Sequence, residues 1–464
     1  MQIGRKDLFW NYAATSMRVL SGLIVMPFTL HMLPSEEIAI WTILLNLINM
    51  TVLLDFGFSN FFSRNITLVF SGVKELKVKG YAIAETSEID YGLLKTLLSA
   101  VKRYYGVVAL IFITVFVAAT PFYLPAVLAN FSGDTQLVWI AWIIFGGALA
   151  YELYTYCYNA LLLGRGMVKR STQITVLSHS IRIVVTIILL FLGLRILAIV
   201  LGILISDLIN RVLLHRVFYD RETKRRLANA TSTSVKGIIK TLAPNSLRTG
   251  CVILSNFLRK QIIVFIAPFY FSLTELAEYG ISERIISIMP ALGLIWFNTF
   301  YAKLSQYRVQ GDMAGVKRLY IKGKLALIVV FALAGGGLLL WGADALALIK
   351  SNTSLLCNGY LSIMMVFSFL EANKEMANHM FLTKNEVPFY KADIASGFLS
   401  LALLALMLYV TSWGILSLIL ASGVALCAYL NWKIPLAVRT ELSLGFRDYC
   451  LTVKQFYKEN SNRK

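Results

Sequence analysis

Apolar residues gather into twelve stretches, each about long enough to cross a bilayer, and polar segments separate them. A membrane-spanning helix needs about 20 apolar residues, whereas a barrel strand shows about ten residues of alternating polarity. Because these runs are long, the pattern predicts an all-α polytopic membrane protein. The predicted spans are 8–32, 37–58, 104–124, 137–162, 172–193, 196–217, 239–268, 276–302, 324–342, 358–382, 391–411 and 413–436.

The segments between the spans are mostly short, and the largest is the segment 71–103. After a polar stretch, residues 91–105 show an amphipathic pattern. We expect this part to be a surface helix that lies on the cytoplasmic face of the membrane. The first span is too long for a signal-peptide core and lacks a small-residue cleavage site, so we expect no cleavable leader.

Composition supports the membrane assignment. Hydrophobic residues make up 58% of the chain and charged residues 15%, against about 25% charged in a typical soluble domain. The five cysteines lie mostly in apolar segments without metal-ligand spacing, which indicates reduced, buried thiols. We expect no metal and no other cofactor.

The formal charge of +19 could suggest a nucleic-acid partner, but its distribution indicates topology instead. Lysine and arginine concentrate in alternate loops, whereas the opposite loops hold few, such as Arg195 and Lys350. Since basic loops stay on the cytoplasmic side, we expect both termini in the cytoplasm, anionic lipid contacts and no nucleic acid.

The two halves of the sequence echo one another. Residues 16–18 read SMR in the first span, and residues 246–248 read SLR in the seventh. Glu152 in the fourth span and Glu371 in the tenth each precede an asparagine by seven residues. Six spans per half predict a parallel repeat about an axis along the membrane normal, with a cargo cavity between the halves. The expected lobes are residues 1–225 and 226–464.

Arginines inside apolar spans are the main functional signal. A cation at the bilayer centre costs about 2.5–3.5 kcal/mol on insertion scales, so these side chains need a protein interior or a wet cavity. A cavity lined by arginine suits an anionic cargo, because guanidinium groups bind phosphate oxygens in pairs. Arg64, at the end of the second span, is either an entry contact for phosphate or a topology anchor. The candidate cargo-binding residues are Arg18, Arg182, Arg248, Arg259, Arg284 and Arg64.

Several of these charges have neighbours that could neutralise them. Arg284 follows Glu283, and Arg259 precedes Lys260, so one member of each pair could snorkel or be balanced. Asp207 and Arg211 are four residues apart and are expected to pair on the surface of one helix. In the tenth span, a lysine three residues after Glu371 could satisfy that helix internally.

Glu152 and Glu371 also have two interpretations. Buried carboxylates can exchange protons and couple transport to an ion gradient. Equally, they can simply balance the arginines. Both interpretations stay open at the level of sequence.

The segment Leu54–Ser59 (LDFGFS), followed by Arg64 and by Thr67–Gly72 (TLVFSG), resembles the Wzx-type polysaccharide flippases. Those proteins belong to the superfamily that also holds the multidrug-and-toxin extruders (MATE) and lipid II flippases. The resemblance implies a MATE-like fold of twelve helices in the inner membrane of a bacterium. It also implies translocation of undecaprenyl-pyrophosphate-linked oligosaccharide to the periplasmic leaflet by alternating access, as a monomer working with polysaccharide polymerase machinery in O-antigen (lipopolysaccharide) or capsule biosynthesis.

Two other classes of function were weighed. A multidrug exporter of the same superfamily, driven by H⁺ or Na⁺, would favour an acidic, aromatic cavity over one rich in arginine. A polymerase or glycosyltransferase would need large external loops with catalytic residues, and these loops are short. We expect no catalytic constellation, since the four histidines are isolated, and no ATP-binding loop is present.

Overall fold

A computed structural model gives the three-dimensional structure of the chain. Within the described helices, the side chains of residues 5–9, 11–16, 18–20, 60–61, 64, 159, 235–249 and 382 lie outside the description, and Arg18, Arg64 and Arg248 are among them. The described residues are 5–70, 72–74, 88–231, 235–301, 304, 307–308, 310–382, 388–445 and 448.

The described part of the chain is helical throughout, without a β-strand. The short helices α3, α6 and α17 each follow the preceding helix after a break of one or two residues. The elements are α1 (Arg5–Met32), α2 (Ser35–Asp55), α3 (Phe58–Phe70), α4 (Tyr91–Val127), α5 (Thr135–Thr155), α6 (Cys157–Gly164), α7 (Val168–Phe191), α8 (Arg195–Phe218), α9 (Arg221–Asn229), α10 (Val235–Ile266), η1 (Ala267–Phe269), α11 (Leu273–Thr299), α13 (Met313–Leu348), α14 (Asn358–Leu382), α15 (Tyr390–Val410), α16 (Leu416–Cys427) and α17 (Leu430–Glu441).

The helices correspond to the twelve predicted membrane passes. Ten stretches of the described residues are long and apolar enough to cross a membrane. The other two passes are α1, which is apolar over Ser21–Met32, and α14, which carries several charged residues. The predicted fold class, an all-α membrane protein with twelve helices in two halves, is confirmed.

The chain divides into two compact units by its internal packing. Unit 1 comprises Met1–Phe257, Ser272–Thr274 and Ile349–Thr353, and unit 2 comprises the rest. The division falls inside α10, whereas the expected lobes meet at residues 225 and 226, inside α9. The first part of α10 belongs with unit 1 because Gly250 lies against Phe56, where an added Cβ would be only 1.7 Å from the ring.

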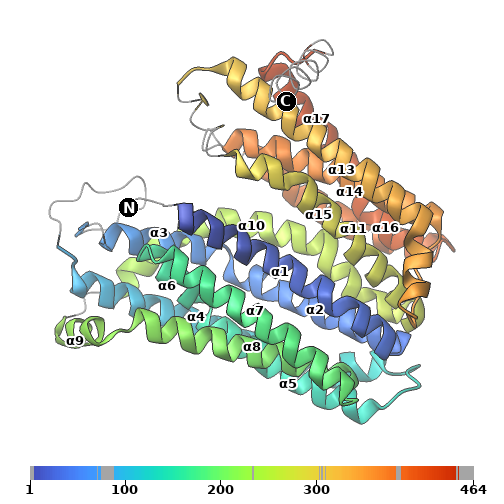
Figure 1. The fold of residues 1–464 in the computed structure, drawn as a ribbon, viewed down its shortest axis with the longest axis horizontal. Helices are drawn as coiled ribbons and strands as arrows, with labels where there is room; N and C mark the ends of the chain where they lie inside the picture. Colours follow the sequence, from blue (N-terminus) through green and yellow to red (C-terminus); the bar gives the residue numbers. More distant parts are fainter. Residues whose placement is uncertain are drawn as a thin grey trace, which may run out of the picture. The chain divides into compact units, whose positions relative to one another are not determined.

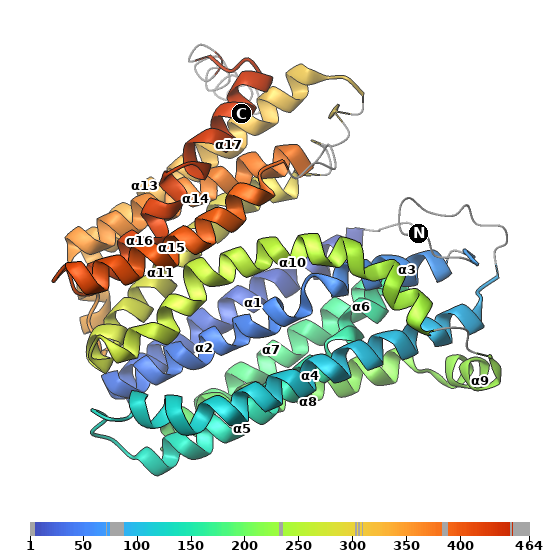
Figure 2. The ribbon, with the colours of Figure 1, turned by 180° about the vertical axis from the view of Figure 1, so that it is seen from behind.

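Helix packing repeats from one unit to the other. In unit 1, α7 lies along α8 and α1, and α5 packs against α4 and α8 (Figure 1). In unit 2, α15 lies along α16, and α14 packs against α13, α16 and α17 (Figure 2). In unit 1 the fifth pass contacts the sixth, the fourth contacts the sixth, and the third contacts the fourth. The same three contacts recur in unit 2, six passes later along the chain. This recurrence agrees with the repeat read from the sequence.

The second pass breaks near its end. α2 stops at Asp55, and Phe56 and Gly57 have positive φ angles of 51° and 71° before α3 begins. The Asp55 carboxylate caps the new helix, since it accepts hydrogen bonds from Ser59 N at 3.1 Å and Ser59 Oγ at 2.7 Å. Tyr105 also donates to this buried carboxylate. The predicted span 37–58 therefore ends at this capped joint, and α3 continues the pass to Phe70.

The expected surface helix 91–105 is wrong. These residues form the first part of the 37-residue helix α4, whose start is capped by Asp90. Leu94, Leu97 and Val101 are buried in a core shared with α3, α6, α8 and α9. The amphipathic pattern is real, but its apolar face packs on protein instead of lying on lipid.

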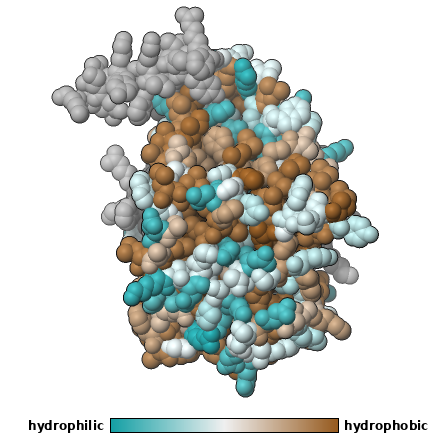
Figure 3. Space-filling view, turned by 90° about the vertical axis from the view of Figure 1, so that its right-hand side faces the viewer, coloured by the Kyte–Doolittle hydropathy of each residue, from teal (hydrophilic) through white to brown (hydrophobic). Residues whose placement is uncertain are grey.

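The third pass of each unit carries much of the exposed apolar surface. On α4, Leu110 and Val117 are more than 60% exposed, and on α13 Leu333 and Leu340 are at least 70% exposed. Figure 3, viewed from the right-hand side of Figure 1, shows hydrophobic and hydrophilic residues side by side on the surface. Exposed apolar side chains suit acyl chains, so α4 and α13 are lipid-facing helices.

Candidate functional site

Four charged residues on three helices form a cluster inside unit 1. Glu152 lies on α5, Arg182 near the middle of α7, and Asp207 and Arg211 on α8. Arg211 Nη2 is 3.6 Å from Glu152 Oε1. Arg182 interacts electrostatically with both Asp207 and Glu152. The four formal charges cancel, which lowers the cost of holding them at membrane depth.

Arg211 is buried, and neighbouring residues of α8 form hydrogen bonds with α7. Its side chain is 5% exposed, and its guanidinium carbon lies 5.9 Å from the centre of the Tyr156 ring. Beside it, Asn210 Nδ2 donates to Ser178 Oγ at 3.1 Å, and Ser206 Oγ donates to the Ser178 carbonyl at 3.0 Å. These bonds fix α8 against α7 next to the charged cluster.

A second cluster lies inside unit 2, where α10, α11 and α14 contribute charges. Lys260 Nζ is 2.7 Å from Glu371 Oε2. The Lys260 side chain is 47% exposed and that of Glu371 is 21% exposed, although both lie within membrane passes. Glu283 of α11 adds an electrostatic interaction with Lys260. A half-exposed ammonium group at this depth needs a polar surrounding.

Arg259, next to Lys260, occupies a different environment. Its side chain is completely buried, and Nη1 donates to Ser396 Oγ at 2.6 Å and to the Asp393 carbonyl at 3.2 Å. Asp393 Oδ1 lies 3.7 Å from Arg259 Nη1 and 3.9 Å from Lys374 Nζ. Arg259 therefore holds α10 to α15 and presents no surface to a ligand in this structure.

The structure describes the side chains of three of the candidate residues, Arg182, Arg259 and Arg284. Arg182 joins the cluster of unit 1, and Arg284 is half-buried beside Glu283, with which it interacts electrostatically. The expectation that Arg259 lines a cavity does not fit its full burial, because its donors bind partners within the protein. The side chains of Arg18, Arg64 and Arg248 lie outside the described residues.

In the two clusters, the ion pairs shorter than 4 Å connect different helices. Arg211, expected to pair with Asp207 four residues away, lies nearest to Glu152 of α5. Glu371 interacts electrostatically with Lys374 of its own helix, as expected, and it also pairs with Lys260 of α10. Asp393 was not among the predicted site residues, although a carboxylate within an apolar span signals a buried partner.

This arrangement changes the electrostatic picture of the site. Carboxylates interact with each of four cations in the two clusters, namely Arg182, Arg259, Lys260 and Arg284. A site for anions can therefore work by exchange, in which an incoming phosphate replaces a carboxylate at a guanidinium or ammonium group. Among the described residues, no group of three or more His, Cys, Asp or Glu residues could hold a metal ion.

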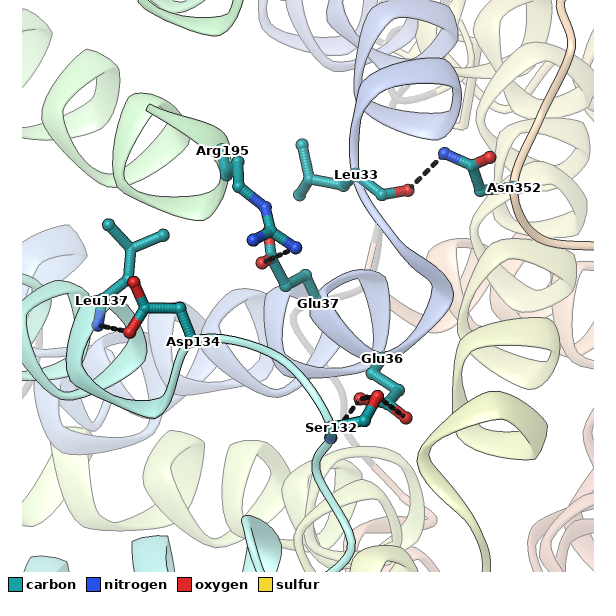
Figure 4. A network of polar contacts seen from close by, with 8 residues as sticks. All are labelled: Leu33, Glu36, Glu37, Ser132, Asp134, Leu137, Arg195 and Asn352. Carbon is teal, nitrogen blue, oxygen red and sulfur yellow. Dashed lines mark hydrogen bonds and ion pairs between the residues drawn. The ribbon is translucent and has the colours of Figure 1, made fainter. Parts of the chain in front are cut away.

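Unit 1 also holds a polar network where α1 ends and α2 begins (Figure 4). The fully buried Glu37 carboxylate lies 2.7 Å from Arg195 Nη2. Glu36 accepts hydrogen bonds from Ser132 N at 2.8 Å and Ser132 Oγ at 3.0 Å. Asn352 Nδ2 donates to the Leu33 carbonyl at 2.9 Å. Arg195, expected in a loop, thus anchors α8 to α2.

At the other end of unit 1, Arg165 joins the end of α6 to the start of α9. Its Nη2 lies 2.9 Å from Asp220 Oδ2, and its Nη1 donates to the Phe218 carbonyl at 3.0 Å. Asp220 caps α9 by accepting from Thr223 N at 2.8 Å. The hydrogen bonds from Thr223, together with Arg165, hold the pKa of Asp220 below its usual range.

No protein-family model and no curated protein matches the chain by sequence. Solved structures do match. The fold is shared with MATE transporters and a lipid II flippase. An inward-facing multidrug resistance MATE family transporter of the MOP superfamily has a TM-score of 0.64 at 14% identity, covering 92% of this chain and 94% of its own.

The lipid II flippase MurJ in an inward closed conformation has a TM-score of 0.63 at 11% identity, covering 96% of this chain and 90% of its own. An outward-facing MATE transporter has a TM-score of 0.56 at 14% identity, covering 94% of this chain and 95% of its own. These likenesses establish the MATE fold for this chain. Similarity at this level of identity does not extend to cargo, which has to be argued from the residues.

Proposed function

We propose that the chain is a flippase that moves undecaprenyl-pyrophosphate-linked oligosaccharides from the cytoplasmic to the periplasmic leaflet of a bacterial inner membrane. It works by alternating access, as a monomer with both termini in the cytoplasm, alongside polysaccharide polymerase machinery. The chain itself catalyses no reaction. The MATE fold supports a transport function, and the similarity to a lipid II flippase supports a lipid-linked cargo.

The observation that carries the proposal is Lys260. It lies within a membrane pass, it is 47% exposed, and its partner Glu371 is also partly exposed. An ammonium group in contact with acyl chains would be strongly unfavourable, so this surface of α10 suits water and polar cargo. The cargo has a pyrophosphate that such cations can bind.

Arginines supply the remaining phosphate contacts of the proposed site. Arg18 and Arg248 occupy echoing positions in the first and seventh passes, and Arg182 and Arg284 lie in the fifth and eighth. A guanidinium group offers two parallel donors to phosphate oxygens, which a lysine cannot do. Arg64, in the middle of α3, would meet the cargo where it enters.

The proposal is tested by following the cargo in proteoliposomes. We expect purified protein to move labelled undecaprenyl-pyrophosphate oligosaccharide to the outer leaflet, where an external glycosidase can cleave it. The variants Arg18→Gln and Arg248→Gln should each slow this cleavage at least about tenfold, because one charge-assisted hydrogen bond is lost. Lys350→Gln, which alters a lysine of the loop between α13 and α14, is the control. Wild-type activity in the Arg18→Gln/Arg248→Gln double variant would reject the assignment.

Glu152 and Glu371 are the proposed ion-coupling residues. Each forms an ion pair within its own unit, with Arg211 in one case and Lys260 in the other. Protonation of either carboxylate would release its cation toward the cargo. Glu152→Gln and Glu371→Gln should therefore remove the dependence of transport on a pH gradient, and unchanged gradient dependence in both variants would exclude coupling through these residues.

One observation favours a second function, a multidrug exporter driven by H⁺ or Na⁺. Arg182, Arg259, Lys260 and Arg284 are matched by carboxylates, so these residues do not form a strongly positive site. Uptake of the cationic dye ethidium into the same proteoliposomes separates the two functions. Transport of ethidium without transport of the glycolipid would favour the exporter.

A further inference from the structure

We infer that Arg211 is a further cargo-binding residue, which recognises a phosphate oxygen of a prenyl diphosphate, and that Glu152 is its internal competitor. The inference rests on the proposed function and extends it to a residue that the sequence pattern assigned to a surface pair. In the cargo-free state Glu152 holds the guanidinium group. When the diphosphate arrives, Arg211 exchanges this carboxylate for a phosphate oxygen.

The geometry of the pair shows that it is loosely held. Arg211 Nη2 is 3.6 Å from Glu152 Oε1, whereas charge-assisted hydrogen bonds in proteins are about 2.7–2.9 Å long. The Lys260–Glu371 and Arg195–Glu37 pairs both have distances of 2.7 Å. The Glu152–Arg211 pair is therefore the longest of these three, although Arg211 is almost completely buried.

The donors of Arg211 are also incompletely used. Nη1 is buried and has no hydrogen-bond partner among the described residues. A buried donor left without a partner costs about 1–3 kcal/mol, so the group needs an explanation, and a ligand that fills the position is one. Arg165 is the contrasting case, since one terminal nitrogen binds Asp220 and the other binds a backbone carbonyl.

The surroundings suit a ligand with two negative charges. Arg182 lies close enough to interact with Glu152 and Asp207, so two guanidinium groups and two carboxylates share the cluster. A diphosphate that displaced Glu152 would meet both cations. Asp207 would keep one of them partly balanced, which prevents the cluster from holding the cargo too tightly to release it.

The helix that carries Glu152 is interrupted beside the cluster. α5 ends at Thr155, and Tyr156, whose ring lies over the Arg211 guanidinium, joins it to α6. A break in the helical hydrogen-bond ladder at such a point is frequent at functional sites. It lets the ring and the carboxylate leave Arg211 without disturbing the whole helix.

The test measures the affinity of undecaprenyl pyrophosphate for the full chain in lipid nanodiscs. Glu152→Gln should tighten binding at least about fivefold, because the competitor loses its charge. Arg211→Gln should weaken it at least about tenfold. In the double variant Glu152→Gln/Arg211→Gln the affinity should equal that of Arg211→Gln, because the carboxylate acts only through the guanidinium group.

Two further variants keep the test decisive. Arg211→Gln alone leaves a buried carboxylate unpaired and could unfold the protein, whereas the double variant removes both charges. Arg211→Lys keeps the charge but loses the paired donors, and it should bind more weakly than wild type. Glu222→Gln on α9, a surface residue paired with Arg226, is the control and should bind like wild type.

The outcomes separate this inference from the proposed function. If Glu152→Gln does not tighten binding, or tightens it equally with and without Arg211, the exchange is overturned while wild-type binding still supports the flippase. If wild type does not bind undecaprenyl pyrophosphate at all, both the exchange and the proposed cargo are rejected.

Discussion

At the scale of single residues, two adjacent side chains of α10 differ sharply in their exposure to solvent. Arg259 is completely buried, whereas Lys260 is 47% exposed. Successive helical residues point about 100° apart, so one faces α15 and the other faces away from that contact. A charge within an apolar span therefore identifies either a structural bond or a polar surface, and the helix face decides which.

We predict that Arg259→Met strongly destabilises the protein. Removing one partner of a buried ion pair typically costs about 3–5 kcal/mol, because the other charge is left without compensation. The melting temperature in detergent should fall clearly below that of wild type. The double variant Arg259→Met/Asp393→Leu should recover part of the loss, since Lys374 retains its interaction with Glu371.

Arg226→Met provides the matched control for this prediction. Its side chain is 55% exposed and pairs with Glu222 on the surface of α9, and such surface pairs contribute about 0–1 kcal/mol. Its melting temperature should stay close to wild type. An equal effect of Arg226→Met and Arg259→Met would contradict the structural role of Arg259.

The charged residues of the candidate site could be found from the sequence, but their partners could not. Arg182, Glu152 and Glu371 stand out because charge is rare in apolar spans. Which carboxylate meets which cation depends on how helices far apart in the chain pack. Sequence spacing favours partners three or four residues away, so it points to Lys374 but not to Lys260 of α10 as a partner of Glu371.

At the scale of elements, close helix contacts depend on small residues. Gly202 of α8 faces Thr186 of α7, and an added Cβ would lie 2.0 Å from the Thr186 hydroxyl. Small residues at such contacts let helix backbones approach each other, which stabilises packing in membranes.

Gly202→Ala should therefore lower the melting temperature, because overpacking a tight contact costs about 1–3 kcal/mol. Gly147→Ala on α5, where no heavy atom lies within 4 Å, should leave it unchanged or raise it slightly. Adding Thr186→Ala should restore part of the stability lost in Gly202→Ala. A stable Gly202→Ala variant would show that α7 and α8 can separate without cost.

The cap of α9 predicts a pH dependence. The pKa of Asp220 is lowered in the folded protein. The stability that its carboxylate adds to the folded state is therefore present above the ordinary pKa of about 4, and it is lost as the pH falls through the folded pKa. Asp220→Ala should speed hydrogen exchange of the Thr223 amide at pH 7, as expected for a lost cap of about 1 kcal/mol. Wild type and variant should converge at low pH, and a constant difference would contradict the cap.

Element boundaries show where sequence patterns reach their limit. The positions of all twelve passes follow from apolar length, which membrane thickness sets directly. The joint between α2 and α3 was missed because the positive φ of Phe56 depends on the Asp55 cap and on Tyr105 of α4. The start of α4 was misplaced because an amphipathic pattern does not reveal whether lipid or protein covers its apolar face.

For the whole molecule, the basic loops predict a single orientation. Alkaline phosphatase fused after Lys464 should be inactive, because it would remain in the cytoplasm, and phosphatase inserted at Gly133 between α4 and α5 should be active. Green fluorescent protein at the same two sites should give the opposite pattern. Active phosphatase at the C-terminus would reverse the proposed direction of transport.

The pairing of Lys260 with Glu371 has a consequence for how the protein is made. The lysine leaves the ribosome long before the glutamate, so α10 must enter the membrane while its counter-charge has not yet been synthesised. Until Glu371 has been synthesised, each new copy of the protein holds the Lys260 ammonium group in the bilayer without this partner.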